Sequence, residues 1–78
     1  SGRITEIRLI NASGNFVGTS FVLKSTIDNQ TYSLECICYG RDLAEHHSEW
    51  DLVRVTGEIS YYRNDGCWQM EAAIISPA

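Results

Sequence analysis

Hydrophobic and polar residues alternate along most of this chain with the two-residue period of β-strands. The alternation predicts five strands, over residues 3–10, 16–25, 31–39, 52–62 and 67–75. Turn-forming residues separate the hairpins, and Asp65-Gly66 is the strongest of these signals. Between the third and fourth strands, Asp42 and Glu45 have a capping-box-like spacing, which predicts a short helix over residues 42 to about 50. This order of elements favours a small all-β barrel over a sandwich.

Alternation also assigns side chains to the inside and the outside of the predicted barrel. In the fourth strand, the residues expected to point inward are Val53, Val55, Gly57, Ile59 and Tyr61, and those expected outward are Arg54, Thr56, Glu58, Ser60 and Tyr62. In the first strand, Ile4 and Ile7 break the alternation, which predicts a bulge or a bend. Gly18 within the second strand indicates a bend at a barrel corner.

Length and composition are those of one globular domain over residues 1–78, since 44% of the residues are hydrophobic and 21% are charged. No apolar run approaches the length of about 18 residues that a membrane span needs, so we expect no membrane partner. The three cysteines form an odd and sparse set, unlike a secreted disulfide scaffold. The expected location is therefore intracellular, in cytoplasm, nucleoid or organelle matrix.

Two cysteines and two histidines raise the question of a metal site. A structural zinc ion needs four ligands in tetrahedral reach, and its paired cysteines usually have two or more residues between them. Cys36 and Cys38 have one residue between them, so on a strand both thiols belong to the core face. His46 and His47 are adjacent and do not share a helical face, which indicates surface positions. Because the chain also has no recognisable nucleophile–base order or phosphate-binding glycine motif, we expect no metal, no cofactor and no catalytic activity.

Six short motifs follow one another along nearly the whole chain: Gly2-Arg3-Ile4-Thr5, Phe21-x-Leu23, Tyr39-Gly40-Arg41, Leu43-Ala44-Glu45, Gly57-Glu58-Ile59 and Trp68-x-x-Glu71. Their order and spacing resemble those of the bacterial-type single-stranded DNA-binding proteins, whose smaller relatives include primosomal replication proteins and OB-fold subunits of the mitochondrial RNA-editing complex. The resemblance implies an OB-fold, which is a closed five-stranded barrel with a helix between strands 3 and 4. It also implies non-catalytic binding of single-stranded DNA or RNA, as in DNA replication.

In such a domain, bases stack on aromatic side chains and basic side chains contact the phosphates, each stacked base contributing about 1–3 kcal/mol. Arginine adds cation–π contact to its charge. The residues that the resemblance assigns to this surface are Tyr39, Arg41, Arg54, Tyr62, Arg63 and Trp68. The alternative interpretation is that Tyr39 and Trp68 only cover the barrel.

Several features depart from the family pattern. Ser33 and Glu35 stand where the family has a tryptophan and a basic residue, and the last hairpin is short. The first half of the family's first strand is missing or supplied otherwise. The chain carries 10 acidic against 6 basic residues, a net charge of −4, which weakens attraction to phosphate. These features favour an alternative function, a protein-interaction module that assembles with itself or with other OB-fold subunits in a replication or RNA-processing complex.

The first strand is the expected contact surface of such a module. A short first strand leaves a sheet edge without a partner, and such edges pair with other chains. The residues expected near the contact are Arg3, Ile4, Ile7 and Leu9. Glu35, Glu58 and Glu71 fall at outward or edge positions, where they either keep strand edges apart or select a basic protein partner.

Overall fold

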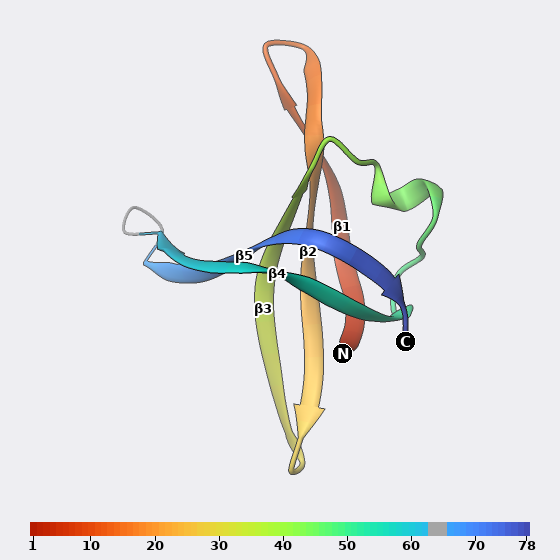
Figure 1. Ribbon diagram of the computed structural model, residues 1–78, viewed down its shortest axis with the longest axis vertical. Helices are drawn as coiled ribbons and strands as arrows, with labels where there is room; N and C mark the ends of the chain where they lie inside the picture. Colours follow the sequence, from red (N-terminus) through yellow and green to blue (C-terminus); the bar gives the residue numbers. More distant parts are fainter. Residues whose placement is uncertain (63–65) are drawn as a thin grey trace.

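Five strands and one helical turn form a closed barrel in the computed structural model, which describes residues 1–62 and 66–78, with the backbone alone at Tyr62 (Figure 1). The elements are β1 (Gly2–Ala12), β2 (Asn15–Ile27), β3 (Gln30–Tyr39), η1 (Leu43–Glu45), β4 (Leu52–Tyr62) and β5 (Cys67–Pro77). Around the barrel the strands follow the order β1-β2-β3-β5-β4, and β4 closes against β1. The β3–β5 pair is parallel and the other pairs are antiparallel. The predicted all-β class and small OB-like barrel are confirmed.

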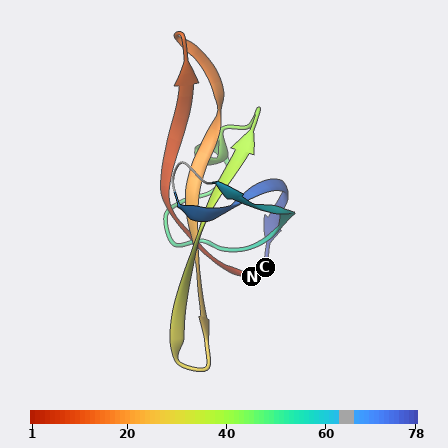
Figure 2. The same ribbon diagram turned by 90° about the vertical axis from the view of Figure 1, so that its left-hand side faces the viewer.

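Long hairpins give the molecule its shape. The β1–β2 and β2–β3 hairpins extend from the barrel in opposite directions, and the β4–β5 hairpin leaves it at the side (Figure 1). Both ends of the chain lie close together, as the second view also shows (Figure 2). The principal extents of 43 × 31 × 18 Å describe a flat and elongated molecule. Because the hairpins extend beyond the region where the strands cross, apolar side chains near their ends stay exposed.

The helix between β3 and β4 is shorter than predicted, because η1 is a single 3-10 turn. The predicted cap is present, since the Asp42 carboxylate accepts a hydrogen bond from the Ala44 N–H at 3.1 Å. Further along, the Ser48 N–H donates to the Asp51 carboxylate at 2.8 Å, and the Asp51 N–H donates to the Ser48 carbonyl. This local turn competes with continued helix. Among the described residues, none of the helical structure is long and apolar enough to cross a membrane.

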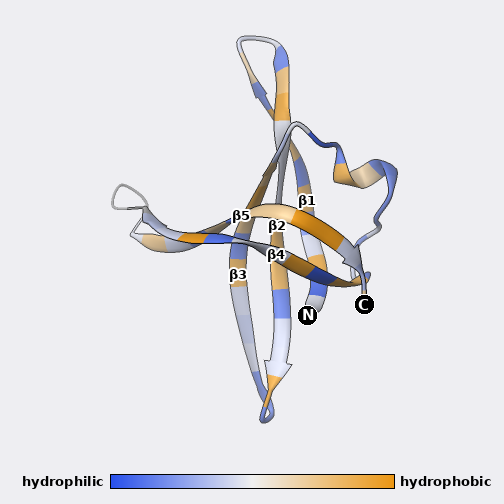
Figure 3. Cartoon of the chain, viewed as in Figure 1, coloured by the Kyte–Doolittle hydropathy of each residue, from blue (hydrophilic) through white to orange (hydrophobic). Residues whose placement is uncertain are grey.

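The core lies where the strands cross, and its buried hydrophobic residues are Ile4, Phe21, Leu23, Cys36, Cys38, Leu43, Val53 and Ala72. The hydrophobic part of β5 crosses the middle of the molecule in the same region (Figure 3). The inward assignment in β4 holds for Val53 and for the half-buried Val55. The expected burial of Ile59 and Tyr61 is wrong, since they are 55% and 52% exposed. They share the face of Met70, which packs against the core, but sit where the hairpin has left the barrel.

Of the two irregularities predicted as alternatives in the first strand, a bulge or a bend, the structure has a bulge. The β1–β2 register shifts between Thr5 and Arg8, and Glu6 has a φ of +52°. The side chain of Glu49, from the loop before β4, accepts hydrogen bonds from the Thr5 hydroxyl at 2.7 Å and from the N–H groups of Glu6 and Ile7 at 3.0 Å each. The loop before β4 therefore covers the β1 edge at the bulge.

Candidate nucleic-acid interface

The structure divides the residues that the family resemblance assigned to one binding surface. Tyr39 is half exposed at the end of β3, and Arg41 follows it in the loop that leads to η1. Arg54 lies near the start of β4 and Tyr61 lies near its end, where the β4–β5 hairpin turns. Seven residues of strand separate their backbone positions by about 23 Å. Trp68 is paired with Tyr61 at that far end. The Tyr62 side chain and Arg63 lie outside the described residues, so their predicted role stays a prediction.

Trp68 and Tyr61 form an aromatic pair on the β4–β5 hairpin. Their ring centroids are 5.3 Å apart and the rings are inclined at 55°. Trp68 is 61% exposed and shares its face of β5 with Met70, which packs against the core. Trp68 therefore points to the opposite side of the strand from Gln69, the neighbour of Glu35 on β3. It is not part of the same surface as the outward residues of β3.

The outer face of β1–β3 brings other polar and basic residues into line. Pairing across the three strands places four rows of residues one after another on this side of the sheet: Arg3–Lys24–Ser33, Thr5–Val22–Glu35, Arg8–Ser20–Ile37 and Ile10–Gly18–Tyr39. Thr5 is buried there, because the side chain of Glu49 covers it. At the last of these a Cβ on Gly18 would lie 2.4 Å from the Cys38 carbonyl oxygen, so β2 and β3 approach closely there. The face thus contains three basic residues and ends at Tyr39.

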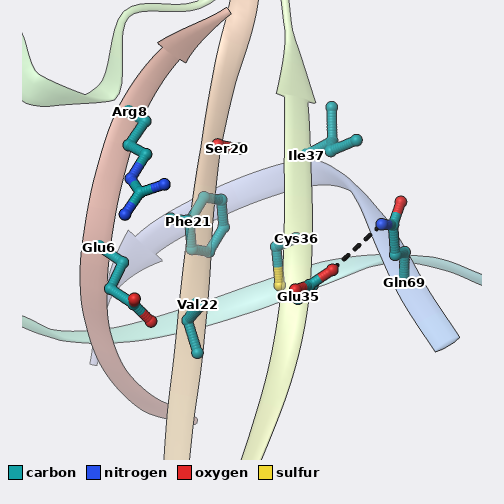
Figure 4. Close-up of a pocket in the computed structure, with 9 residues that line it drawn as sticks. All are labelled: Glu6, Arg8, Ser20, Phe21, Val22, Glu35, Cys36, Ile37 and Gln69. Carbon is teal, nitrogen blue, oxygen red and sulfur yellow. Dashed lines mark hydrogen bonds between the residues drawn. The ribbon is translucent and has the colours of Figure 1, made fainter. Parts of the chain in front are cut away.

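A shallow hollow of about 210 Å³ lies in the middle of this face (Figure 4). Arg8 and Glu6 line it from β1, and Glu35 lines it from β3. Gln69 of β5 donates a hydrogen bond to the Glu35 carboxylate at 3.1 Å, and the Cys67 thiol lies 3.8 Å from the same oxygen. With two carboxylates and one guanidinium, the central hollow has a net negative lining.

A second hollow, of about 550 Å³, lies at the end of the face beside the start of β1, and we call it the Trp50 hollow. Its lining includes Arg3, Lys24, Ser25, Thr26, Thr31 and Trp50. The Lys24 Nζ atom lies 5.8 Å from the centroid of the Trp50 ring, and an Arg3 guanidinium nitrogen donates to the Trp50 carbonyl oxygen at 2.9 Å. No Asp or Glu is among its lining residues.

Neither Lys24 nor Trp50 is among the residues that the sequence assigned to a binding surface. The register of the β1–β2 hairpin could have revealed Lys24, because it pairs Lys24 with Arg3 and so places both side chains on the same face. No local signal marks Trp50, which comes to the hollow through contacts between the loop before β4 and β1.

The two cysteines of β3 and one of the two histidines lie where the sequence predicted. Cys36 and Cys38 are buried in the core, and burial raises the pKa of the Cys36 thiol to about 12. Burial also raises the pKa of Cys38, although the charge of Arg41 opposes part of this effect. His46 is exposed and His47 is half-buried. Within the described ranges, no three His, Cys, Asp or Glu side chains come close enough together to hold a metal ion.

The interface predicted on the first strand needs correction. Ile4 is 0% exposed and part of the core, so its side chain cannot contact a partner. Ile7 packs against the core, and the Arg3 guanidinium donates a hydrogen bond to the Trp50 carbonyl oxygen. Leu9 is exposed. β1 has 11 residues and is longer than predicted, but it pairs with β4 only at Gly2 and Arg3. Next to that pairing, the Ile4 N–H donates to the Asp51 carbonyl and the Trp50 N–H donates to the Ile4 carbonyl.

Comparison with known proteins gave no match, either to family models, to curated proteins or to solved structures.

Proposed function

We propose that this barrel binds single-stranded nucleic acid, DNA or RNA, along the outer face of β1–β3 and without catalysis. The observation that supports this most is the alignment of Arg3, Lys24 and Arg8 on one face of a chain that is acidic overall. From Gly18 to Lys24 the face is six residues long, about 20 Å at the rise of a strand. That length accommodates a short segment of a single strand, in keeping with the small site sizes of OB-folds.

The charge distribution sets the expected strength of binding. Phosphate contacts by Lys and Arg release counterions, so affinity falls as salt rises. Glu35 opposes binding because its row lies between the row that contains Arg3 and Lys24 and the row that contains Arg8. We therefore expect weak and strongly salt-dependent binding. Tyr39, at the Gly18 end of the face, would stack one base.

The test is a fluorescence-anisotropy titration with labelled oligo-dT and oligo-U over a salt series. Three phosphate contacts predict a slope of roughly −2 for log K against log salt on single strands. Arg8→Gln should weaken binding and bring the slope closer to zero. Absence of binding to both oligomers at low salt would refute the proposal. A larger loss from Arg54→Gln than from Arg8→Gln would move the path from β1–β3 to β4.

A second candidate function is a protein-interaction module, alone or with other OB-fold subunits, and the β4–β5 hairpin favours it. Ile59, Tyr61 and Trp68 expose apolar surface on one face of that hairpin, next to Met70 and the core. Exposed aromatic side chains of this kind are common at protein interfaces. Sedimentation equilibrium at tens of micromolar, with wild type and Trp68→Ser, tests self-association. A monomer at every concentration would leave a foreign partner as the remaining form of this candidate.

A further inference from the structure

The Trp50 hollow differs in charge from the other hollows described on this molecule. Arg3 and Lys24 line it and no acid does, which gives the lining a charge of +2. The central hollow has Glu6 and Glu35 against Arg8. Two further hollows also have a net negative lining: the one beside η1, with Asp42 and Glu45 against Arg41, and the one between β4 and β5, with Glu58 and Glu71. In a chain with a net charge of −4, this local excess of positive charge favours an anion.

The backbone of Trp50 is held in a conformation that bulky residues rarely adopt. Its φ is +71°, in the left-handed region. Its N–H donates to the Ile4 carbonyl at 2.6 Å, its carbonyl accepts from Arg3 at 2.9 Å, and the next carbonyl, of Asp51, accepts from the Ile4 N–H at 3.0 Å. The indole nevertheless remains 53% exposed. Strained residues that their surroundings fix in place cluster at binding sites.

The side chains around the ring are donors. The Lys24 ammonium group lies 5.8 Å from the ring centroid and has three N–H donors. Arg3 uses one guanidinium nitrogen for the Trp50 carbonyl, which leaves further N–H donors for a ligand. Ser25, Thr26 and Thr31 add hydroxyl groups to the same lining. An aromatic ring beside two cations suits a ligand that combines a flat ring with a phosphate.

We propose that the Trp50 hollow is a nucleotide subsite, an inference that rests on the proposed function and extends it. One base stacks on the open part of the Trp50 indole, and its phosphate contacts Lys24 and Arg3. The hollow lies at the Arg3–Lys24 end of the outer face of β1–β3, so it continues the path of the strand rather than forming a separate site. Because every base has a stacking face, the subsite takes any base.

The first test compares variants in the anisotropy titration with oligo-dT. Trp50→Asn removes the ring and retains a residue that tolerates positive φ. It should weaken binding roughly fivefold to a hundredfold, the range that loss of one stacked base produces. Trp50→Phe should restore most of the affinity, and Lys24→Gln should weaken binding and reduce the salt slope. The matched control is Ile74→Thr, which removes a similarly exposed apolar side chain, 58% exposed, from β5.

The second test measures Trp50 fluorescence directly in a Trp68→Phe background, since the chain has two tryptophans. Oligo-dT should quench the emission. Inorganic polyphosphate, which has no bases, should compete without quenching to the same extent, and poly-glutamate peptide should compete weakly.

Separate results overturn the subsite and the function. If wild type binds oligo-dT and Trp50→Asn binds equally well, the subsite is refuted and the function stands. If neither oligomer binds wild type, both are refuted. If polyphosphate or poly-glutamate binds as tightly as oligo-dT, with the same quenching, the hollow is a plain anion or acidic-peptide site and the base-stacking role is refuted.

Discussion

The hydroxyl group of Thr19 accepts a hydrogen bond from the backbone N–H of Leu43 at 3.2 Å, and thereby joins the second strand to the turn that follows the third. The same hydroxyl donates to the carbonyl oxygen of Arg41. Thr19 is 0% exposed, and Leu43 beside it is part of the core. One buried polar atom therefore fixes η1 against the barrel and satisfies two backbone groups of the connecting segment.

Replacing Thr19 by Val keeps the shape of the side chain and removes both hydrogen bonds. The buried Leu43 N–H and Arg41 carbonyl would then lack this partner, a change that typically costs about 1–3 kcal/mol. Urea unfolding followed by circular dichroism measures the loss. Thr56→Val, at an exposed position of β4, is the matched control and should change stability little. Equal stability of Thr19→Val and wild type would show that another contact fixes η1.

The five strands and part of the core could be predicted from the sequence because they depend on local alternation. Cys36, Cys38 and Val53 were placed correctly in this way. The failures have a common physical origin in tertiary geometry. Tyr61 lies on the predicted face, but alternation does not show where a hairpin leaves the barrel. The Trp50 hollow likewise depends on contacts between residues more than 40 positions apart, such as that of Arg3 with Trp50.

Glu49 should make stability depend on pH in the acid range. Hydrogen bonds from the Thr5 hydroxyl and from the N–H groups of Ile7 and Glu6 lower the pKa of the Glu49 carboxyl below its usual value of 4.5. A lowered pKa in the folded state stabilises the fold above the usual value, and the stabilisation is lost as pH falls through the lowered one.

Thermal unfolding of wild type and Glu49→Gln between about pH 7 and pH 3 tests this role. The variant should be less stable at neutral pH and should lose less stability on acidification below about pH 4.5 than wild type does. Glu45→Gln, at an exposed position of η1, provides the control. Parallel pH profiles of wild type and Glu49→Gln would contradict the role assigned to the carboxylate.

Glu35 should limit the affinity for nucleic acid. Its carboxylate lies on the outer face of β1–β3, where Val22 and Thr5 are its neighbours across the strands. Replacement by Gln removes one repulsive charge and retains an acceptor for Gln69. Since two charges a few ångströms apart in water interact by about 1 kcal/mol, oligo-dT should bind roughly twofold to fivefold more tightly. The anisotropy titration at low salt measures the gain, with Glu45→Gln for comparison. Unchanged or weaker binding would argue against a path across β3.

Tyr61→Ala should destabilise the domain far less than removal of a core aromatic. Tyr61 is 52% exposed, and its main described contact is the Trp68 ring at 5.3 Å. Loss of such an aromatic pair costs about 0.5–1.5 kcal/mol beyond the lost buried area. Phe21 is 2% exposed, and Phe21→Ala should cost about 3–5 kcal/mol. Urea unfolding of both variants distinguishes the two environments. If Tyr61→Ala costs as much as Phe21→Ala, the β4–β5 hairpin is packed against the core or against a second copy, and concentration-dependent unfolding would identify the second case.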